Sequence, residues 1–211
     1  FMVCFFILAF LAYPLLTVFF YSVQSYDVTK IADKGFVGFK NFKTLFADKI
    51  FYRSLSVSVK WVLTEVVSQL VIGMILALLL DKKFKGRGIY RCIVFFPWAV
   101  SGVLTSMLWS LIYNENIGLL NSICKDFGLI TKNMAWLGNM KTVFKSTAVA
   151  ELWRGIPFFA ITILAALQNI PGDLHEASVM DGANTLQEIF LIKIPILKDT
   201  IILTTLLRAV W

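Results

Sequence analysis

The stretch Asn169–Pro195 reads NIPGDLHEASVMDGANTLQEIFLIKIP and is far too polar to cross a membrane. Apolar runs flank it directly, over about 143–167 on one side and from near Ile196 on the other. Blocks of roughly 20 apolar residues are long enough to cross a hydrocarbon core as helices. A polar stretch held between two such blocks is therefore expected at the membrane surface, where something outside the membrane can use it.

The composition excludes an ordinary soluble fold. Hydrophobic residues make up 58% of the chain, charged residues 16%, and the mean hydropathy is +0.77. Soluble domains have about 45–50% apolar and about 25% charged residues. We predict an all-α polytopic membrane protein with a single transmembrane domain over residues 1–211. Five spans are visible, the last is truncated at Trp211, and about six are expected in a full chain, because its final run is short for a span.

The predicted spans cover about 1–23, 54–80, 92–113, 143–167 and 196–211. Between them lie outer loops at 24–53 and 114–142, the first with a short surface helix in GFVGFKNFKTLF, and cytoplasmic segments at 81–91 and 168–195. The orientation follows from the density of basic residues in the short loop 81–91, although loop 24–53 also holds six basic residues. The net charge of +7 suits this orientation better than nucleic acid, because no basic face interleaves with aromatic residues.

Local signals divide the polar stretch into two helices. Asp173 is placed to cap a short helix of about 174–180, with Glu176 three residues later as in a capping box. Gly182 then gives the C-terminal turn. A second helix is expected to lie along the membrane surface toward Pro195, with Leu186, Ile189, Phe190 and Ile192 on its apolar side.

The spacing of this stretch resembles the EAA loop of the sugar-type permeases of ABC importers, which reads Glu-Ala-Ala, three residues, Gly, nine residues, Ile-x-Leu-Pro. Here Glu176-Ala177-Ser178, Gly182 and Ile192-Lys193-Ile194-Pro195 follow one another at those spacings, and the family's Asp181-Gly182-Ala183 is present. Ser178 and Ile194 are conservative departures. On composition alone, an ordinary amphipathic cytoplasmic loop is the alternative.

The resemblance implies the transmembrane domain of a type I ABC importer in a bacterial cytoplasmic membrane. Segments such as FKNFKTLF, LWRGIPFF and LQNIP point to the subunit type of maltose and glycerol-phosphate importers. The implied partners are a second, unlike permease, two ATP-hydrolysing subunits, an extracellular or periplasmic solute-binding protein, a sugar substrate and membrane lipid. The residues that would couple to the ATPase are Glu176, Ala177, Ser178, Asp181, Gly182 and Ala183.

Ionisable residues inside a span are costly and mark candidate functional positions. Glu151 and Arg154 are three apart and can form an ion pair on one helical face, while Gly155 and Pro157 are expected to interrupt the helix. Elsewhere, Lys60 can snorkel to the surface and Glu65 can pair within the bundle. The resemblance assigns the sugar path to Glu151, Gly155 and Phe158, less directly to Trp153 and Arg154, and places Trp211 near a second contact helix. A purely structural ion pair is the alternative.

The leading hypothesis is a non-enzymatic transport subunit without cofactor, metal or catalytic residues. The sequence contains no G-x-x-x-x-G-K-[ST] motif for ATP, and Cys4, Cys92 and Cys124 are far apart without metal-site spacing. One alternative is a permease for a non-sugar or anionic solute such as glycerol phosphate, which Arg154 would allow. A membrane-embedded enzyme using Glu151 and Arg154 is disfavoured, because the single histidine, His175, lies in the cytoplasmic segment.

Overall fold

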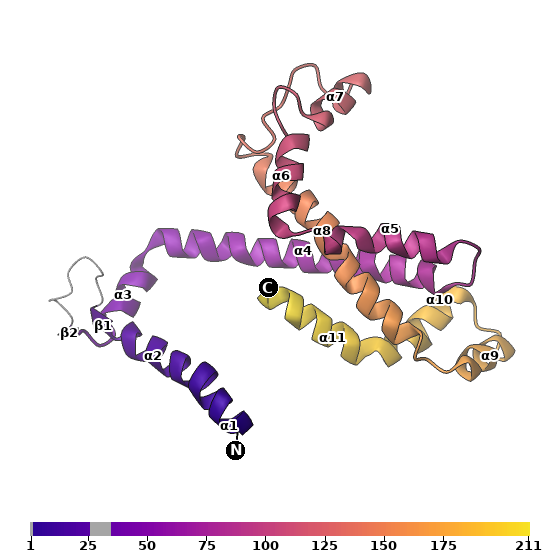
Figure 1. Ribbon diagram of the computed structural model, residues 1–211, viewed down its shortest axis with the longest axis horizontal. Helices are drawn as coiled ribbons and strands as arrows, with labels where there is room; N and C mark the ends of the chain where they lie inside the picture. Colours follow the sequence, from indigo (N-terminus) through magenta and orange to yellow (C-terminus); the bar gives the residue numbers. More distant parts are fainter. Residues whose placement is uncertain (1, 26–34) are drawn as a thin grey trace. The chain divides into compact units, whose positions relative to one another are not determined.

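The computed structural model describes residues 2–25 and 35–211. Their regular structure is helical apart from one antiparallel pair of two-residue strands, β1 (Gln24–Ser25) and β2 (Gly35–Phe36), so the all-α prediction is confirmed. The chain divides into two compact units, Phe1–Val59 and Lys60–Trp211. The helices are labelled in Figure 1.

The first unit contains α1 (Met2–Ile7), a π-helical turn η1 (Leu8–Ala12), α2 (Tyr13–Ser22) and α3 (Lys40–Ala47). Asn41 in α3 donates two 2.9 Å hydrogen bonds, to the carbonyls of Ser22 and Gln24, and so ties α3 to the end of α2. The short surface helix predicted in loop 24–53 is therefore present as α3. Residues 26–34 of that loop lie outside the described residues.

The second unit holds the later part of α4 (Lys49–Asp81) and the remaining helices. They are α5 (Arg87–Ala99), α6 (Gly102–Ile112), α7 (Leu119–Asp126), α8 (Val143–Leu167), α9 (Gly172–Met180), α10 (Thr185–Gln187), the π-helix η3 (Glu188–Lys193) and α11 (Ile194–Val210). Helices α5 and α11 both pack on α8 (Figure 1). Phe159 and Ile163 of α8 form the centre of the core with Val66 and Leu197 from neighbouring helices.

Two helices of the described residues, α4 and α8, are long and apolar enough to cross a membrane. They correspond to the predicted spans 54–80 and 143–167. A third crossing is present if the bent pair α5 and α6 forms one span. Helix α11 has 17 residues, which at about 1.5 Å per residue is shorter than a hydrocarbon core of about 30 Å. The predicted total of five spans is therefore not confirmed.

The predicted span 92–113 is not one continuous helix, because α5 and α6 meet at an angle of 96°. Pro97 lies inside the last turn of α5, and Val100 is extended. Ser101 is also extended and caps α6, its hydroxyl accepting a 3.3 Å hydrogen bond from the Leu104 amide. Composition gave only the apolar length of this segment, whereas the serine cap starts a second helix in a new direction.

Gly73 allows α4 and α8 to approach closely. A Cβ placed at Gly73 would lie 2.5 Å from the Cβ of Phe159 and 3.1 Å from the Ala160 amide nitrogen. Both neighbours are fully buried and belong to the core of the unit. The absence of a side chain at Gly73 therefore sets the distance between the two long helices.

Replacing Gly73 by Ala should force α4 and α8 apart and destabilise the protein by about 1–3 kcal/mol, less the gain in helix propensity of up to about 1 kcal/mol. The measurement is the thermal unfolding midpoint of the detergent-solubilised protein. Gly88→Ala is the matched control, since a Cβ at Gly88 meets nothing within 4 Å. Equal midpoints for the two variants would contradict the proposed close contact.

Candidate functional site

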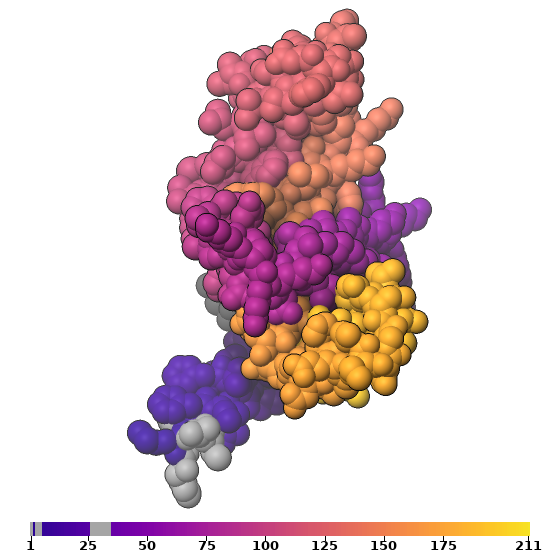
Figure 2. Space-filling model, turned by 90° about the vertical axis from the view of Figure 1, so that its right-hand side faces the viewer, coloured from indigo at the N-terminus to yellow at the C-terminus, as the bar shows by residue number. Residues whose placement is uncertain are grey.

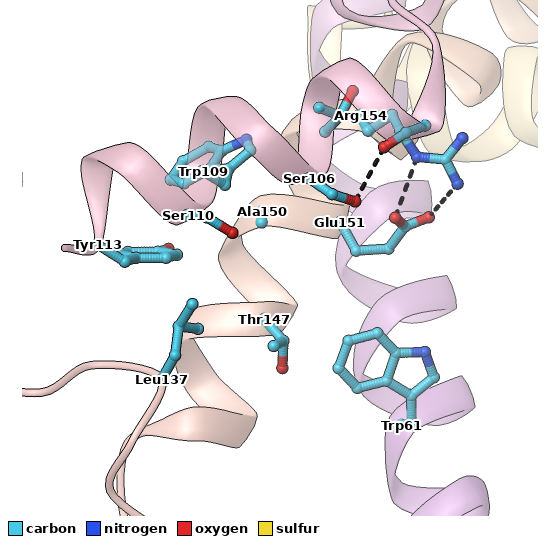
Figure 3. Close-up of a pocket in the computed structure, with 12 residues that line it drawn as sticks. Trp61, Ser106, Trp109, Ser110, Tyr113, Leu137, Thr147, Ala150, Glu151 and Arg154 are labelled. Atoms are coloured by element: carbon cyan, nitrogen blue, oxygen red, sulfur yellow. Dashed lines mark hydrogen bonds and ion pairs between the residues drawn. The ribbon is translucent and has the colours of Figure 1, made fainter.

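A cavity of about 530 Å³ lies between α6, α8 and the N-terminal half of α4 (Figure 3). Trp109 of α6 and Tyr113, which directly follows α6, lie along one wall, and Trp61 of α4 lies opposite. The remaining lining is rich in hydroxyl groups and includes Thr105, Ser106, Ser110 and Thr147. The cavity therefore combines flat aromatic surfaces with hydrogen-bonding groups.

Glu151 and Arg154 form the charged end of the cavity. Arg154 Nε donates to Glu151 Oε2 at 3.1 Å and Arg154 Nη2 donates to Oε1 at 2.9 Å, so the predicted ion pair is confirmed (Figure 3). The two residues are one helical turn apart on α8 and therefore project from the same face. The Arg154 side chain remains 36% exposed, which leaves it accessible from the cavity.

Behind the cavity, a second guanidinium shares the Glu151 carboxylate. Arg208 of α11 pairs with Glu151 through Nη2, and its Nε donates to Gln69 Oε1 at 2.7 Å. Gln69 Nε2 in turn donates to Glu65 Oε2 at 2.9 Å. The network joins α4, α8 and α11, and it pairs Glu65 with an amide instead of a cation.

Arg208 and Gln69 were not singled out by sequence reasoning. Arg208 lies in the last apolar run, so the rule used for Glu151, that an ionisable residue inside a span is a candidate, applies to it equally. Gln69 is uncharged and gave no such signal. Its role depends on the packing of α4 against α8.

Gly155 provides the space for this network, and the predicted interruption of α8 is wrong. A Cβ at Gly155 would overlap the amide group of Gln69. Helix α8 runs without a break through Gly155 and Pro157, both of which are buried. Packing on neighbouring helices thus holds the helix together where Pro157 lacks an amide hydrogen.

The six residues assigned to the sugar path are not all at the cavity. Glu151 and Arg154 line it, and Trp153 packs edge-on against the lining residue Trp109, with ring centres 6.0 Å apart. Phe158 lies against Trp211 instead, at 5.7 Å. Gly155, the sixth, faces Gln69. The sequence therefore predicted that α8 carries the site, but it did not predict which face of α8 lines the cavity.

Asn121 organises the loop around α7, which leads to Leu137, one of the residues that line the cavity. It is 2% exposed, and its Nδ2 donates to the carbonyls of Asn114, Glu115 and Met134 at 3.1–3.4 Å. Its Oδ1 accepts from the Met134 amide at 3.2 Å and from Trp136 Nε1 at 2.9 Å. One buried amide thus fixes both ends of the loop around α7.

The polar stretch between α8 and α11 begins with α9, which confirms the predicted short helix. Its predicted cap is wrong: Pro171 is the N-cap and Asp173 lies in the first turn. The capping box occurs later, where Asn184 and Gln187 bond reciprocally at 2.8 and 2.9 Å. The first turn of α9 has no side-chain cap, and the ring of Pro171, which directly precedes the helix, fixes the φ angle of that residue.

Gly182 ends α9 with φ of +76°, as predicted from its position after the helix. Glu176, Ala177 and Asp181 are exposed, and Figure 2 shows the orange-to-yellow segment that contains α9 on the surface of the unit. Ser178 is 4% exposed and donates to the His175 carbonyl at 2.7 Å. The chain therefore offers a short helix that is exposed along its length except at Ser178.

Glu188 links α9 to the helix that follows it. Its Oε1 lies 2.9 Å from His175 Nδ1 and 3.1 Å from Lys193 Nζ. Burial alone would raise the pKa of Glu188, but the hydrogen bonds and positive charges of Lys193 and His175 outweigh it and lower the pKa. The chain then continues from η3 directly into α11, so Pro195 lies in the first turn of a helix and does not end one.

Long apolar helices around a polar cavity, joined by an exposed polar helix–turn segment, define a membrane protein of the permease class. Residues 69–211 match the family described as "Binding-protein-dependent transport system inner membrane component". The chain belongs to this family.

Similar proteins include the trehalose/maltose transport system permease protein MalF of Thermococcus litoralis, which is 35% identical over 204 residues, 97% of this chain and 68% of that protein. The diacetylchitobiose uptake system permease protein NgcF of Streptomyces coelicolor is 33% identical over 80% of this chain and 51% of that protein. The chain thus spans roughly half to two thirds of the length of these relatives.

A crystal structure of a bacterial ABC transporter that imports the acidic polysaccharide alginate contains a chain of the same fold. The TM-score is 0.81 at 22% identity, and the match covers 98% of this chain and 68% of that chain. Over 98% of its length, this chain therefore has the same fold as that chain of the transporter.

Replacing Asn121 by Ala should release the loop 114–136, because several buried donors and acceptors lose their partner at once. We expect destabilisation of roughly 2–4 kcal/mol and faster cleavage of this loop in limited proteolysis. Asn139→Ala is the control, since the exposed Asn139 side chain accepts a hydrogen bond from the Lys141 amide within its own turn. Unchanged proteolysis of the Asn121 variant would contradict the role given to this side chain.

Proposed function

We propose that this chain is the permease subunit of an ATP-driven, binding-protein-dependent importer that carries a carbohydrate across the cytoplasmic membrane. The observation that carries the proposal is the exposed helix α9, ended by Gly182 in a left-handed turn and joined through η3 to α11. An ATP-hydrolysing partner that binds α9 can move it and so displace α8 and α11, the helices on either side of it in the chain. The family is one of transport components, so the membrane-embedded enzyme is set aside.

The surface that docks to the partner consists of Glu176, Ala177, Asp181, Gly182 and Ala183. Ser178, which is buried, helps to hold this segment in place. Small Ala177 permits close approach of a partner helix or cleft, and the carboxylates of Glu176 and Asp181 suit basic partner residues. These positions are those of the EAA-type spacing in the sequence. ATP binding and hydrolysis take place in two separate subunits.

A carbohydrate suits the cavity chemically. Trp61 and Trp109 offer flat faces for the apolar C–H surface of a sugar ring, and the hydroxyl groups of the lining pair with sugar hydroxyls. Glu151 and Arg154 add an acceptor and a donor. Trehalose, maltose and diacetylchitobiose occur in the names of similar permeases, which supports a di- or oligosaccharide as substrate.

An acidic saccharide or another anionic solute is the second candidate, and the observation that favours it is the half-exposed Arg154 guanidinium at the cavity. The related fold of the alginate importer belongs to a protein that handles an acidic polysaccharide. In the proposed assembly, a second, unlike permease completes the membrane pathway. A solute-binding protein delivers the substrate, as in the alginate transporter that was crystallised with its oligosaccharide-bound periplasmic protein.

Replacing Gly182 by Val should abolish stimulation of ATP hydrolysis by the loaded binding protein, because a β-branched residue is strained at a φ of +76° and will shift α9. The measurement is ATPase activity of the assembled complex in nanodiscs with and without loaded binding protein. Gly128→Val is the matched control: Gly128 also has a positive φ, +67°, but it follows α7 and lies outside the segment that contains α9. Equal stimulation of both variants would refute the coupling role of α9.

The substrate class is tested with the cognate solute-binding protein purified from its native cells. We expect mass spectrometry of the co-purified ligand to find a di- or oligosaccharide, and uptake into proteoliposomes to follow that ligand. Trehalose, maltose and diacetylchitobiose serve as neutral probes, and an alginate oligosaccharide and glycerol phosphate as anionic ones. A peptide or metal ligand would refute the carbohydrate proposal. An anionic ligand would favour the second candidate, an acidic saccharide or another anionic solute.

A further inference from the structure

The Glu151 carboxylate pairs with two guanidinium groups, one exposed at the cavity and one largely buried. Arg154 lies at the cavity and is 36% exposed, whereas Arg208 is 11% exposed and reaches Glu151 from α11. Both donate through Nη2 to the same oxygen, Oε1. A substrate hydroxyl that enters the cavity and bonds to Glu151 or Arg154 therefore changes the interaction left for Arg208.

Arg208 is also connected to the other end of the unit by continuous helix. Every residue from Glu188 to Val210 is helical, through η3 and α11, so the segment can move as one body. At its start, Glu188 contacts His175 of α9 at 2.9 Å and Lys193 of its own turn at 3.1 Å. A displacement of α11 at Arg208 thus reaches α9 through side chains and backbone of this chain alone.

We propose that Arg208 is a positioning residue that couples occupancy of the cavity to the position of α9. The inference rests on the proposed function. With the cavity empty, Glu151 holds Arg208 and keeps α11 against α8 and α4. With substrate bound, Glu151 accepts hydrogen bonds from the substrate, and its ion pair with Arg208 weakens. The η3–α11 segment then shifts together with α9.

The direction of this effect follows from competition for one acceptor. A ligand changes a conformational equilibrium only if it binds the two arrangements with different affinity. Here the difference is whether Glu151 is engaged by Arg208 or free for the substrate. Typical couplings between two sites change an affinity or a response by about 5–150-fold, so loss of Arg208 should produce a change of that order.

The test uses the assembled complex in nanodiscs with its solute-binding protein and trehalose, maltose or diacetylchitobiose as probe. For Arg208→Met we expect the ratio of stimulated to unstimulated ATPase to fall toward 1. The substrate-dependent change in hydrogen exchange of residues 172–193 should be lost as well. Arg208→Lys should restore part of both, since a lysine still pairs with Glu151. Arg91→Met is the control: Arg91 is a partly buried arginine that donates to the Leu80 carbonyl at 3.4 Å, outside the network.

Retained stimulation and retained exchange changes in Arg208→Met would overturn the proposal, as would an equal loss in Arg91→Met. If Arg208→Met does not assemble, Arg208→Lys and Glu188→Gln decide. Each should lower the ratio, and the double variant should lose no more than the stronger single variant, because both lie on one line of transmission. If the double variant instead lowers the ATPase ratio by the product of the two single effects, the proposal is refuted. A wild-type complex that no loaded binding protein stimulates would instead count against the proposed function.

Discussion

The shared carboxylate of Glu151 is the interaction on which the arrangement of the second unit depends. Arg154 of α8 and Arg208 of α11 pair with this carboxylate, and Gln69 of α4 joins the network through Arg208. Gly155 leaves room for the Gln69 amide, which in turn receives Arg208. In a low-dielectric interior an unpaired charge is severely penalised, so the three helices are stable together only when the acceptors and donors meet. Close packing at Gly73 brings α4 within reach of this network.

The cavity is a consequence of the same arrangement. The 96° bend after Pro97 turns α6 away from α5, and Asn121 binds Met134 and Trp136, directly before the lining residue Leu137. Had the apolar segment continued as one straight helix, its aromatic and hydroxyl side chains would not surround a common space with Glu151. Ser101 is thus as important for the cavity as the residues that line it, although it makes a backbone cap and no wall contact.

Sequence reasoning predicted the features that depend on neighbours in the chain. The short helix α9, the left-handed turn at Gly182 and the pair Glu151–Arg154 all follow from spacing within a few residues. It did not find Arg208 as the second partner of Glu151, because that contact joins residues far apart in sequence. The interruption expected at Pro157 was wrong for a related reason: burial against other helices decides whether a proline breaks a helix, and burial is not a local property.

The charges around Glu151 are better explained by function than by stability. Removing ions from water costs several kcal/mol each, and apolar residues of similar volume often hold helices together equally well. A carboxylate shared by two guanidiniums therefore contributes little net stability that leucine or methionine could not supply. It does supply a charged, rearrangeable end to a cavity of aromatic and hydroxyl side chains, paired with Arg208 of a helix that continues through η3 to Glu188, which contacts α9. An apolar core at this position would pack as well, but it would neither bind hydroxyl groups nor respond to their arrival.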